Sequence, residues 1–267
     1  MRGLFQIRGL IAGAVLLTLP AGLRADGIRF PVGEQARYRI QWGLFTCGTS
    51  TFRCDEVEWQ GRTMIRVRVQ AKSNWLVSTI YPVDDTVDCY IDPETGLSVR
   101  LEKHTIEGDK VCKDVLELDR DTQMASWISE SDNISTNYPI EAGACDAVSF
   151  LYAFRKHDFQ ESPSQEFNVA VDTALHSITI DAGKRDTKKI DGLGKILCRQ
   201  FTFTPKRDDL FVRKIPKAIW LSDDERRILV RMDLVVPVGR ARVVLEEYTP
   251  PDAPASEESD IQAVTLN

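Results

Sequence analysis

The chain has 267 residues, 28% of them charged, and its 34 basic and 40 acidic side chains leave a net charge of −6 at pH 7. Nucleic acids and anionic membranes attract clustered basic residues, and this acidic chain has no such cluster, so we expect it to bind neither. The length is enough for one large domain with a full hydrophobic core.

The N-terminal segment has the pattern of a secretory signal peptide, residues 1–25. Arg2 and Arg8 precede an apolar run from residue 10 to residue 19, and small residues lead to an expected cleavage after Ala25. The run is shorter than the ~20 apolar residues that a membrane-spanning helix needs. We therefore expect an exported, periplasmic protein that is soluble and has no transmembrane anchor after cleavage. Cleavage removes three arginines and no acid, which changes the net charge from −6 to −9.

Apolar and polar residues alternate along nearly all of the remaining chain, which is the pattern of half-buried strands. The clearest stretches, in chain order, are residues 38–42, 65–70, 99–102, 167–172, 197–203, 228–234 and 241–245. Turn-forming residues lie between them, such as Asp92–Gly96, Glu107–Asp109 and Asp181–Gly183. Their short spacing predicts antiparallel hairpins that follow one another as a meander.

Residues 144–156 break this alternation. Val148, Leu151 and Tyr152 recur at helical spacing, and basic residues fall at the end of the segment, where the helix dipole favours cations. The segment is therefore predicted to be helical.

The fold class follows from these elements. We predict a mainly β protein, a large curved antiparallel sheet or open half-barrel with one packed α-helix near residues 144–156. Short connections favour a single antiparallel β domain over residues 26–249. Residues 250–267 are proline-rich and acidic, so we expect a disordered tail.

The mature chain keeps six cysteines, and an even number in an exported protein suggests disulfides. The disulfide candidates are Cys47, Cys54, Cys89, Cys112, Cys145 and Cys198. Sequence does not choose among the possible pairings, and buried free thiols are the alternative. Metal sites need closely spaced cysteines and histidines, which are absent here, so we expect no metal and no cofactor.

Two pairs of aspartates invite a catalytic interpretation. Asp223 and Asp224 lie between two apolar stretches, where Ser222 and Asp223 favour the first positions of a turn. Asp84 and Asp85 follow a Tyr-Pro step, which restricts the tyrosine to extended geometry and favours a turn after it. We interpret both pairs as turns.

Other catalytic signals are weak. The three histidines are not spaced as zinc ligands, and His104 falls among charged residues of a strand, which favours a solvated side chain. The serine-hydrolase elbow and the phosphate-binding loop are absent. We therefore favour a non-enzymatic protein with no catalytic residues. The alternative is a periplasmic hydrolase or carbohydrate-active enzyme that uses Asp85, Asp223 or Asp224 with His104.

Aromatic residues recur in or beside the predicted strands, and a curved sheet lined by them can enclose a cavity for an apolar ligand. The candidate ligand-binding residues are Trp42, Phe45, Trp75, Trp127 and Trp220. Alternatively, they fill the core. The expected partner is a lipid or other apolar envelope component, or an envelope protein. A structural or assembly factor without a pocket is a further alternative.

Several short segments, in a fixed order, resemble a bacterial envelope family, the domain of unknown function 3108. The first segment is FPVGEQARYRIQWGLFTCGTSTF, with Phe30, Gly33, Glu34, Tyr38, Trp42 and Gly48 as matching positions. Further matches are Tyr81-Pro82, Asp85 and Gly96, then Asp146 and Tyr152–Arg155, and finally IWLSDDERRILVRM and VGRARVVL. The cysteines depart from the family pattern. The resemblance implies export and a mostly antiparallel β fold, and it implies no enzymatic activity.

Overall fold

A computed structural model describes residues 30–206, 216–236 and 239–251. The predicted signal peptide and most of the predicted tail lie outside the described residues. The described residues form one 15-stranded sheet in the order β8-β7-β6-β5-β4-β3-β2-β1-β15-β14-β13-β12-β11-β10-β9. The chain therefore runs outward from β1 to one edge, crosses to the other edge, and returns until β15 pairs with β1.

The first half of the sheet contains β1 (Gln35–Trp42), β2 (Phe45–Trp59), β3 (Arg62–Ser73), β4 (Val83–Ile91), β5 (Ser98–Glu107), β6 (Lys110–Asp119), β7 (Met124–Ser129) and β8 (Ile134–Pro139). The second half contains β9 (Cys145–Asp146), β10 (Ser164–Val171), β11 (Ala174–Ile190), β12 (Gly194–Pro205), β13 (Pro216–Ser222), β14 (Leu229–Val236) and β15 (Gly239–Thr249). The helices are α1 (Trp75–Ser78) and α2 (Ser149–Lys156). Every described strand pair is antiparallel except β9–β10. The predicted fold class, a mainly antiparallel meander, is confirmed.

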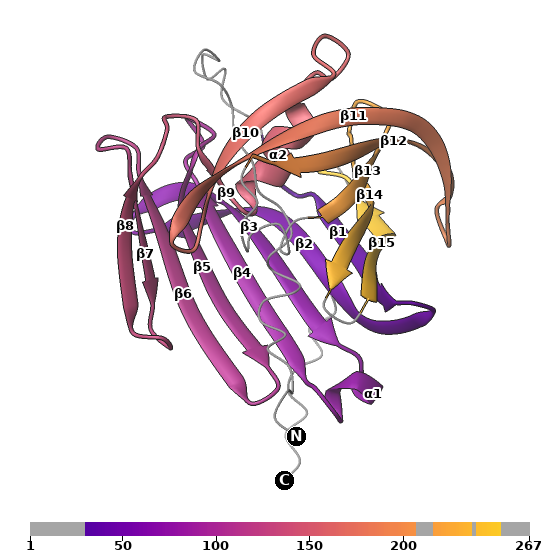
Figure 1. Ribbon diagram of the computed structural model, residues 1–267, viewed down its shortest axis with the longest axis horizontal. Coiled ribbons are helices and arrows are strands. Elements are labelled where there is room, and N and C mark those ends of the chain that lie inside the picture. The colour runs from indigo at the N-terminus through magenta and orange to yellow at the C-terminus, as the bar shows by residue number, and fades with distance from the viewer. Residues whose placement is uncertain (1–29, 207–215, 237–238, 252–267) are drawn as a thin grey trace.

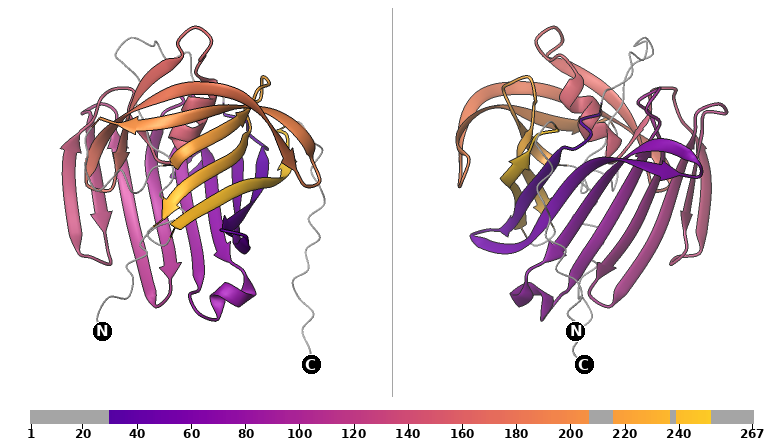
Figure 2. Two further views of the ribbon diagram at one scale, coloured as in Figure 1. Left: turned by 45° about the vertical axis from the view of Figure 1, so that its right-hand side comes forward. Right: turned by 180° about the vertical axis from the view of Figure 1, so that it is seen from behind.

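The sheet is strongly curved. Strands β3–β8 form one broad wall, strands β10–β13 arch over its upper end, and α2 lies between these two parts (Figures 1 and 2). This arrangement lets one sheet cover both sides of its own core, as in an open barrel.

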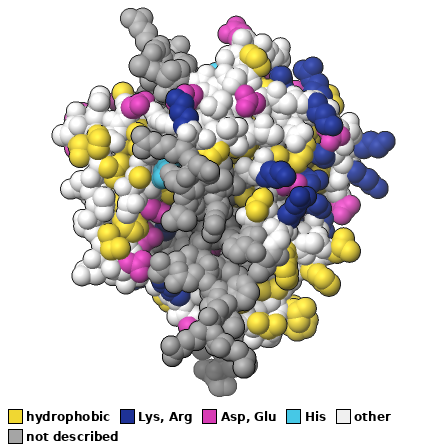
Figure 3. All heavy atoms as spheres, in the orientation of Figure 1, with side chains coloured by type: hydrophobic (Ala, Val, Ile, Leu, Met, Phe, Trp, Pro, Cys, Tyr) yellow, Lys and Arg dark blue, Asp and Glu magenta, His cyan; other side chains and the backbone are white. Residues whose placement is uncertain are grey.

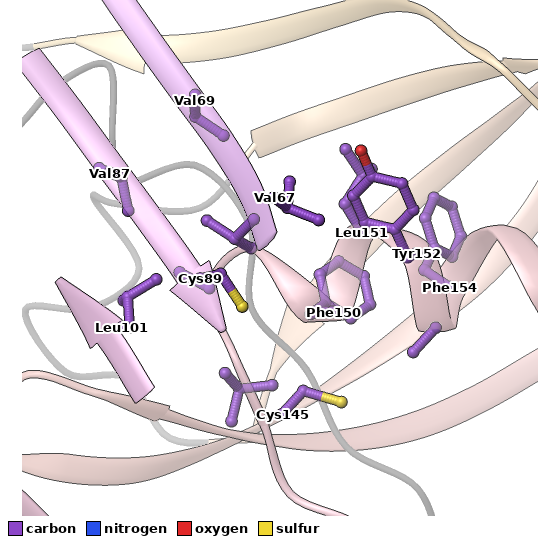
Figure 4. Packing of buried hydrophobic residues seen from close by; sticks show 14 of the residues in the cluster. Val67, Val69, Val87, Cys89, Leu101, Cys145, Phe150, Leu151, Tyr152 and Phe154 are labelled. Atoms are coloured by element: carbon purple, nitrogen blue, oxygen red, sulfur yellow. The ribbon is translucent and has the colours of Figure 1, made fainter. Parts of the chain in front are cut away.

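The core lies between the concave face of the sheet and α2. Cys54, Val67, Cys89 and Leu101 are partners in register on consecutive strands, and all four are buried. Figure 4 shows Val67, Cys89 and Leu101 on the side of their strands that faces Phe150 of α2. The period-two alternation of these strands places this row inside and the charged residues outside.

The helix is shorter than the sequence predicts. It begins at Ser149, while Cys145–Asp146 forms the short strand β9. One oxygen of Asp146 accepts hydrogen bonds from the N–H groups of Val148 at 2.6 Å and Ser149 at 3.0 Å, which holds a turn before the helix. A second helix, α1, is a single turn that the sequence analysis did not predict.

Two of the turn predictions are wrong. Asp181–Gly183 lies within the long strand β11, where the pairing with β12 shifts between Ala182 and Arg185, so the glycine marks a bulge. Asp84 and Asp85 lie in β4, because the chain has already reversed at α1 and the residues after it. By contrast, Asp223 and Asp224 do form the connection between β13 and β14.

Candidate docking surface

Three of the predicted binding residues, Trp42, Phe45 and Trp75, gather at one end of the sheet. Trp42 ends β1 and Phe45 begins β2, so the two flank a hairpin turn, and Trp75 begins α1. Asn74 joins the two segments: its backbone N–H donates to the carbonyl of Cys47 at 2.8 Å, and its side-chain amide donates to the carbonyl of residue 46 at 2.6 Å. The β1–β2 hairpin and α1 are therefore held side by side.

Large apolar side chains at this end are exposed. We call the set the apolar end; its members are Trp42 (47% exposed), Leu44 (95%), Phe45 (75%), Trp75 (79%), Leu76 (57%) and Ile80 (85%). Figure 3 shows hydrophobic side chains at the lower right, where Figure 1 places α1 and the β1–β2 hairpin. Phe45 lies before the first residue of β2 that pairs with β3, and Leu76 lies on the single turn of α1, which leaves both side chains open to solvent.

The apolar end carries no charge. Residues 40–52 and 73–83 contain no Asp, Glu, Lys or Arg, although 28% of the chain is charged. The nearest charged side chains on β3 and β4 are Lys72 and Asp84, which are exposed and pair with each other at 3.0 Å. On the other side of the hairpin, Ala241 of β15 pairs with Trp42 and lies between Arg240 and Arg242, so the charged residues border the apolar end and are not part of it.

A glycine makes the close packing beneath the apolar end possible. A Cβ on Gly48 would lie 2.1 Å from the carbonyl oxygen of Lys72 on the neighbouring strand. Any other residue would push β2 away from β3 at the point where the hairpin and α1 meet. This requirement accounts for the glycine at position 48.

The two remaining predicted binding residues lie elsewhere. Trp127 is buried on the inner face of β7. Trp220 is buried in a separate small cluster, where the charged groups of Lys188 and Arg231 each lie 4.7 Å from its ring centre. The structure therefore brings together Trp42, Phe45 and Trp75, but not Trp127 or Trp220.

Cavities in the described part of the chain are lined by other residues. Their volumes are about 290, 210 and 400 Å³, and charged side chains contribute to the lining of each one. None of the five predicted aromatic residues lines these three cavities. Trp42, Phe45 and Trp75 thus form an exposed surface and do not line one of these three cavities.

The residues of the alternative catalytic hypothesis are not brought together. Asp85 pairs with Thr105 and faces the interior, whereas His104, one residue earlier, is exposed on the opposite face. Asp223 and Asp224 belong to the β13–β14 connection in the other half of the sheet. The geometry offers no shared cleft for an Asp-His pair.

The two acids of that connection stabilise it. Asp223 accepts a hydrogen bond from Arg185 at 2.6 Å. Asp224 accepts from the Ser222 hydroxyl at 2.6 Å and from Arg226 at 2.6 and 3.0 Å. Burial by itself raises the pKa of Asp224, but these hydrogen bonds outweigh it and lower the pKa. Asp224 is thus an ionised turn residue with its donors in place.

Comparison with known proteins places the chain in a family. The family model described as "Protein of unknown function (DUF3108)" matches residues 37–246, which is most of the chain. The chain belongs to the DUF3108 family. This confirms the resemblance found in the sequence, and the family's description names no activity. No curated protein matches.

Among the solved structures that are similar in fold to this DUF3108 chain is one from another family of unknown function. It is the crystal structure of a β-barrel-like protein of the domain of unknown function DUF1849 from Brucella abortus. The similarity has a TM-score of 0.54 at 9% identity and covers 84% of this chain and 99% of that one. At this identity the likeness shows the fold alone.

The cysteines of this DUF3108 chain are all free thiols, contrary to the predicted disulfides. Cys54 and Cys89 illustrate the reason: both are buried on the same face, but Val67 lies between them on β3. Two strand spacings separate their Cα atoms by about 9.5 Å, which is beyond the reach of a disulfide. Burial raises the pKa of Cys54 to about 12, so its thiol stays protonated.

Within the described ranges, no cluster of three or more His, Cys, Asp or Glu side chains could hold a metal ion. No helix in the same ranges is long and apolar enough to cross a membrane.

Proposed function

We propose that the protein is an exported, non-catalytic component of the cell envelope that docks on the lipid surface of a membrane through the apolar end. The observation that carries the proposal is the gathering of six large apolar side chains, each at least 47% exposed, at one end of the sheet. Proteins seldom expose apolar patches of this kind unless they contact a partner or a membrane. The signal-peptide pattern of residues 1–25 supports the exported location.

The chemistry of the apolar end fits a lipid surface better than a protein partner. Two of its residues, Trp42 and Trp75, are of the type that favours the membrane–water interface, where the ring is apolar and the N–H meets water. The apolar side chains come from the β1–β2 hairpin, from α1 and from the turn after α1. Because the six side chains of the apolar end carry no charge, their insertion suits a zwitterionic bilayer.

The expected affinity of the apolar end for a bilayer is modest. Partial insertion at about 1 kcal/mol per side chain gives about 6 kcal/mol in all, which corresponds to a dissociation constant on the order of tens of micromolar. This contact is hydrophobic, so it should change little with salt.

The test is co-sedimentation with phosphatidylcholine vesicles. We expect the wild type to sediment with the vesicles and the double variant Leu44→Ser/Ile80→Ser to bind about thirtyfold more weakly, since it loses two of the most exposed apolar side chains at about 1 kcal/mol each. Both positions are exposed, so the fold should be unaffected, which the melting temperature checks.

Leu197→Ser is the matched control. Leu197 on β12 is also half exposed, but it lies outside the apolar end. It should leave vesicle binding unchanged. An equal loss of vesicle binding in Leu197→Ser and in the double variant would refute docking on lipid and favour a protein partner. A wild type that does not sediment with the vesicles would have the same meaning.

A further inference from the structure

A second feature, unrelated to the apolar end, is an arginine-lined groove on the outer face of the sheet. The groove has a volume of about 400 Å³, and its lining includes Arg37, Arg53, Arg66 and Arg68 from the adjacent strands β1, β2 and β3. These residues alternate along their strands with buried core residues, so their guanidinium groups point away from the core. The concentration of arginines contrasts with the net negative charge of the whole chain.

Three of the four arginines have carboxylate partners. Arg66 donates to Asp55 at 2.6 Å, Arg68 donates to Asp88 through Nε and Nη2 at 2.7 and 2.8 Å, and Arg37 pairs with Glu247. Each of these three charges is therefore compensated within the protein.

Arg53 is different. It is exposed, and among the described residues no hydrogen bond or ion pair joins its guanidinium to another side chain. Its partner in register on β3 is Arg68, so two positive charges lie directly opposite each other. Asp88 already compensates the charge of Arg68, so Arg53 is the arginine of the groove that no carboxylate of the described residues balances, and an anion beside it would do so.

We propose that this groove binds the phosphate group of a soluble phosphate ester, with Arg53 as its main ligand and Arg68 as the second. A guanidinium presents two parallel N–H donors that match two phosphate oxygens. Arg68 keeps its Nη1 donors, because Asp88 accepts only from Nε and Nη2. A doubly charged phosphate monoester accepts from both arginines at once, whereas a carboxylate has a single charge to share between them.

The rest of the groove suits the polar part of such an ester. Its lining also includes Gln35, Gln70, Thr51 and Thr249, whose amides and hydroxyls can donate to or accept from the hydroxyl groups of a ligand. The carboxylate of Glu247 lines the groove as well and is paired with Arg37. A volume of about 400 Å³ holds a molecule larger than inorganic phosphate and lies within the usual range for small-molecule sites.

The position of the groove favours a soluble ester over a phospholipid headgroup. Arg53 lies eight residues along β2 from Phe45 of the apolar end, a distance of about 26 Å at 3.3 Å per residue. A bilayer that touches the apolar end therefore does not reach the groove. The two surfaces are separate, and the phosphate site stands whether or not the apolar end binds lipid.

The experiment is calorimetric titration of the full chain with glycerol 3-phosphate, inorganic phosphate and, as a neutral reference, glycerol. We expect saturable binding of both phosphates, weaker at high salt, and none of glycerol. Arg53→Gln should lower the affinity for glycerol 3-phosphate at least about tenfold. Arg62→Gln is the matched control, because Arg62 is an exposed arginine in the same β2–β3 hairpin outside the groove, and it should leave the affinity unchanged.

Three outcomes separate the possibilities. Absence of saturable binding at millimolar phosphate, or an equal loss in the Arg53 and Arg62 variants, would overturn the site. Vesicles of phosphatidylglycerol provide a second arm, in which wild type and Arg53→Gln should bind alike. If Arg53→Gln alone weakened vesicle binding, the phosphate would belong to a lipid headgroup and the soluble ester would be refuted.

Discussion

At the scale of single residues, Asp85 is an acid that the protein buries without full compensation. It is 1% exposed, one oxygen accepts the backbone N–H of Ile106 at 3.1 Å, and the other oxygen has no hydrogen-bond partner. Burial, and then the carboxylate of Glu107, raise the pKa of Asp85 to about 7, although the Ile106 N–H lowers it. The folded protein therefore holds this proton more tightly than the unfolded chain does.

Asp85 should make the stability depend on pH. Its unfolded pKa is about 4, so its effect is absent below that pH and the free energy of unfolding falls as the pH rises through about 7. Asp85→Asn keeps an acceptor for Ile106 but cannot ionise. We expect the free energy of unfolding of this variant, measured by urea denaturation and taken relative to the wild type, to increase by on the order of 1–2 kcal/mol from about pH 5 to about pH 8.

The exposed neighbour provides the control for this measurement. Asp84→Asn removes the same charge from a side chain that already pairs with Lys72 at the surface. Because Asp85 is intact in this variant, its free energy of unfolding should still fall as the pH rises through about 7. The same fall in Asp85→Asn would show that Asp85 ionises equally in the folded and unfolded states.

At the scale of elements, α2 is the part of the chain that the sheet encloses. Its residue Phe154 is fully buried and makes ring contacts with Phe150, Phe159, Phe201 and Phe203 at centroid distances of 4.9 to 6.0 Å. These contacts join the helix to the loop after it and to β12. One short helix therefore carries much of the packing between the two parts of the sheet.

Replacement of phenylalanine by alanine should destabilise the protein strongly in the core and hardly at all at the apolar end. Phe154→Ala leaves a cavity among four aromatic rings, and we expect a loss of about 3–5 kcal/mol in the free energy of unfolding. Phe45→Ala changes a side chain that is 75% exposed, and we expect a change of about 0.5 kcal/mol or less. Denaturant midpoints measure both. A large loss for Phe45→Ala would mean that the apolar end supports the fold and is not a free docking surface.

At the scale of the whole molecule, one buried ion pair joins distant parts of the chain. Arg155 of α2 donates to both oxygens of Glu34, just before β1, at 2.6 and 2.7 Å. The hydroxyl of Tyr248 on β15 donates to the same carboxylate at 2.9 Å, and Arg155 also donates to the carbonyl of Arg226 at 3.1 Å. The first strand, the helix and the last strand are thereby held at one point.

Removal of Arg155 alone should lower the free energy of unfolding more than removal of both charges of the Glu34–Arg155 pair. Arg155→Met leaves the Glu34 carboxylate buried without its cation, and we expect a loss of about 3–5 kcal/mol. The double variant Glu34→Gln/Arg155→Met buries no charge and should lose less than Arg155→Met alone. Urea denaturation of the two single variants and the double variant gives the coupling energy. Strictly additive losses would show that the pair does not act as a unit.

Much of the fold was predictable from the sequence, because a strand with one buried face must alternate with a period of two. The stretches at residues 38–42, 65–70 and 99–102 all lie in strands, and the family motifs agree with the match over residues 37–246. The Asp223–Asp224 turn followed from local chemistry in the same way. By contrast, Asp181–Gly183 has turn-forming residues but lies inside a strand, because pairing with β12 on one side and β10 on the other outweighs the local preference.

The candidate sites depended on tertiary structure. The alternation of apolar and polar residues correctly places Tyr38, Ile40 and Trp42 on the same face of β1. Only the assembled sheet decides that Tyr38 and Ile40 are covered (3% and 7% exposed), while Trp42, at the strand end, is 47% exposed. Likewise, sequence does not reveal that Arg53 faces Arg68, because the register between strands sets that contact. The sequence by itself determined the family and the strand faces, since these follow from local pattern. Tertiary structure decided which side chains stay uncovered, since burial depends on neighbours that are distant in the chain.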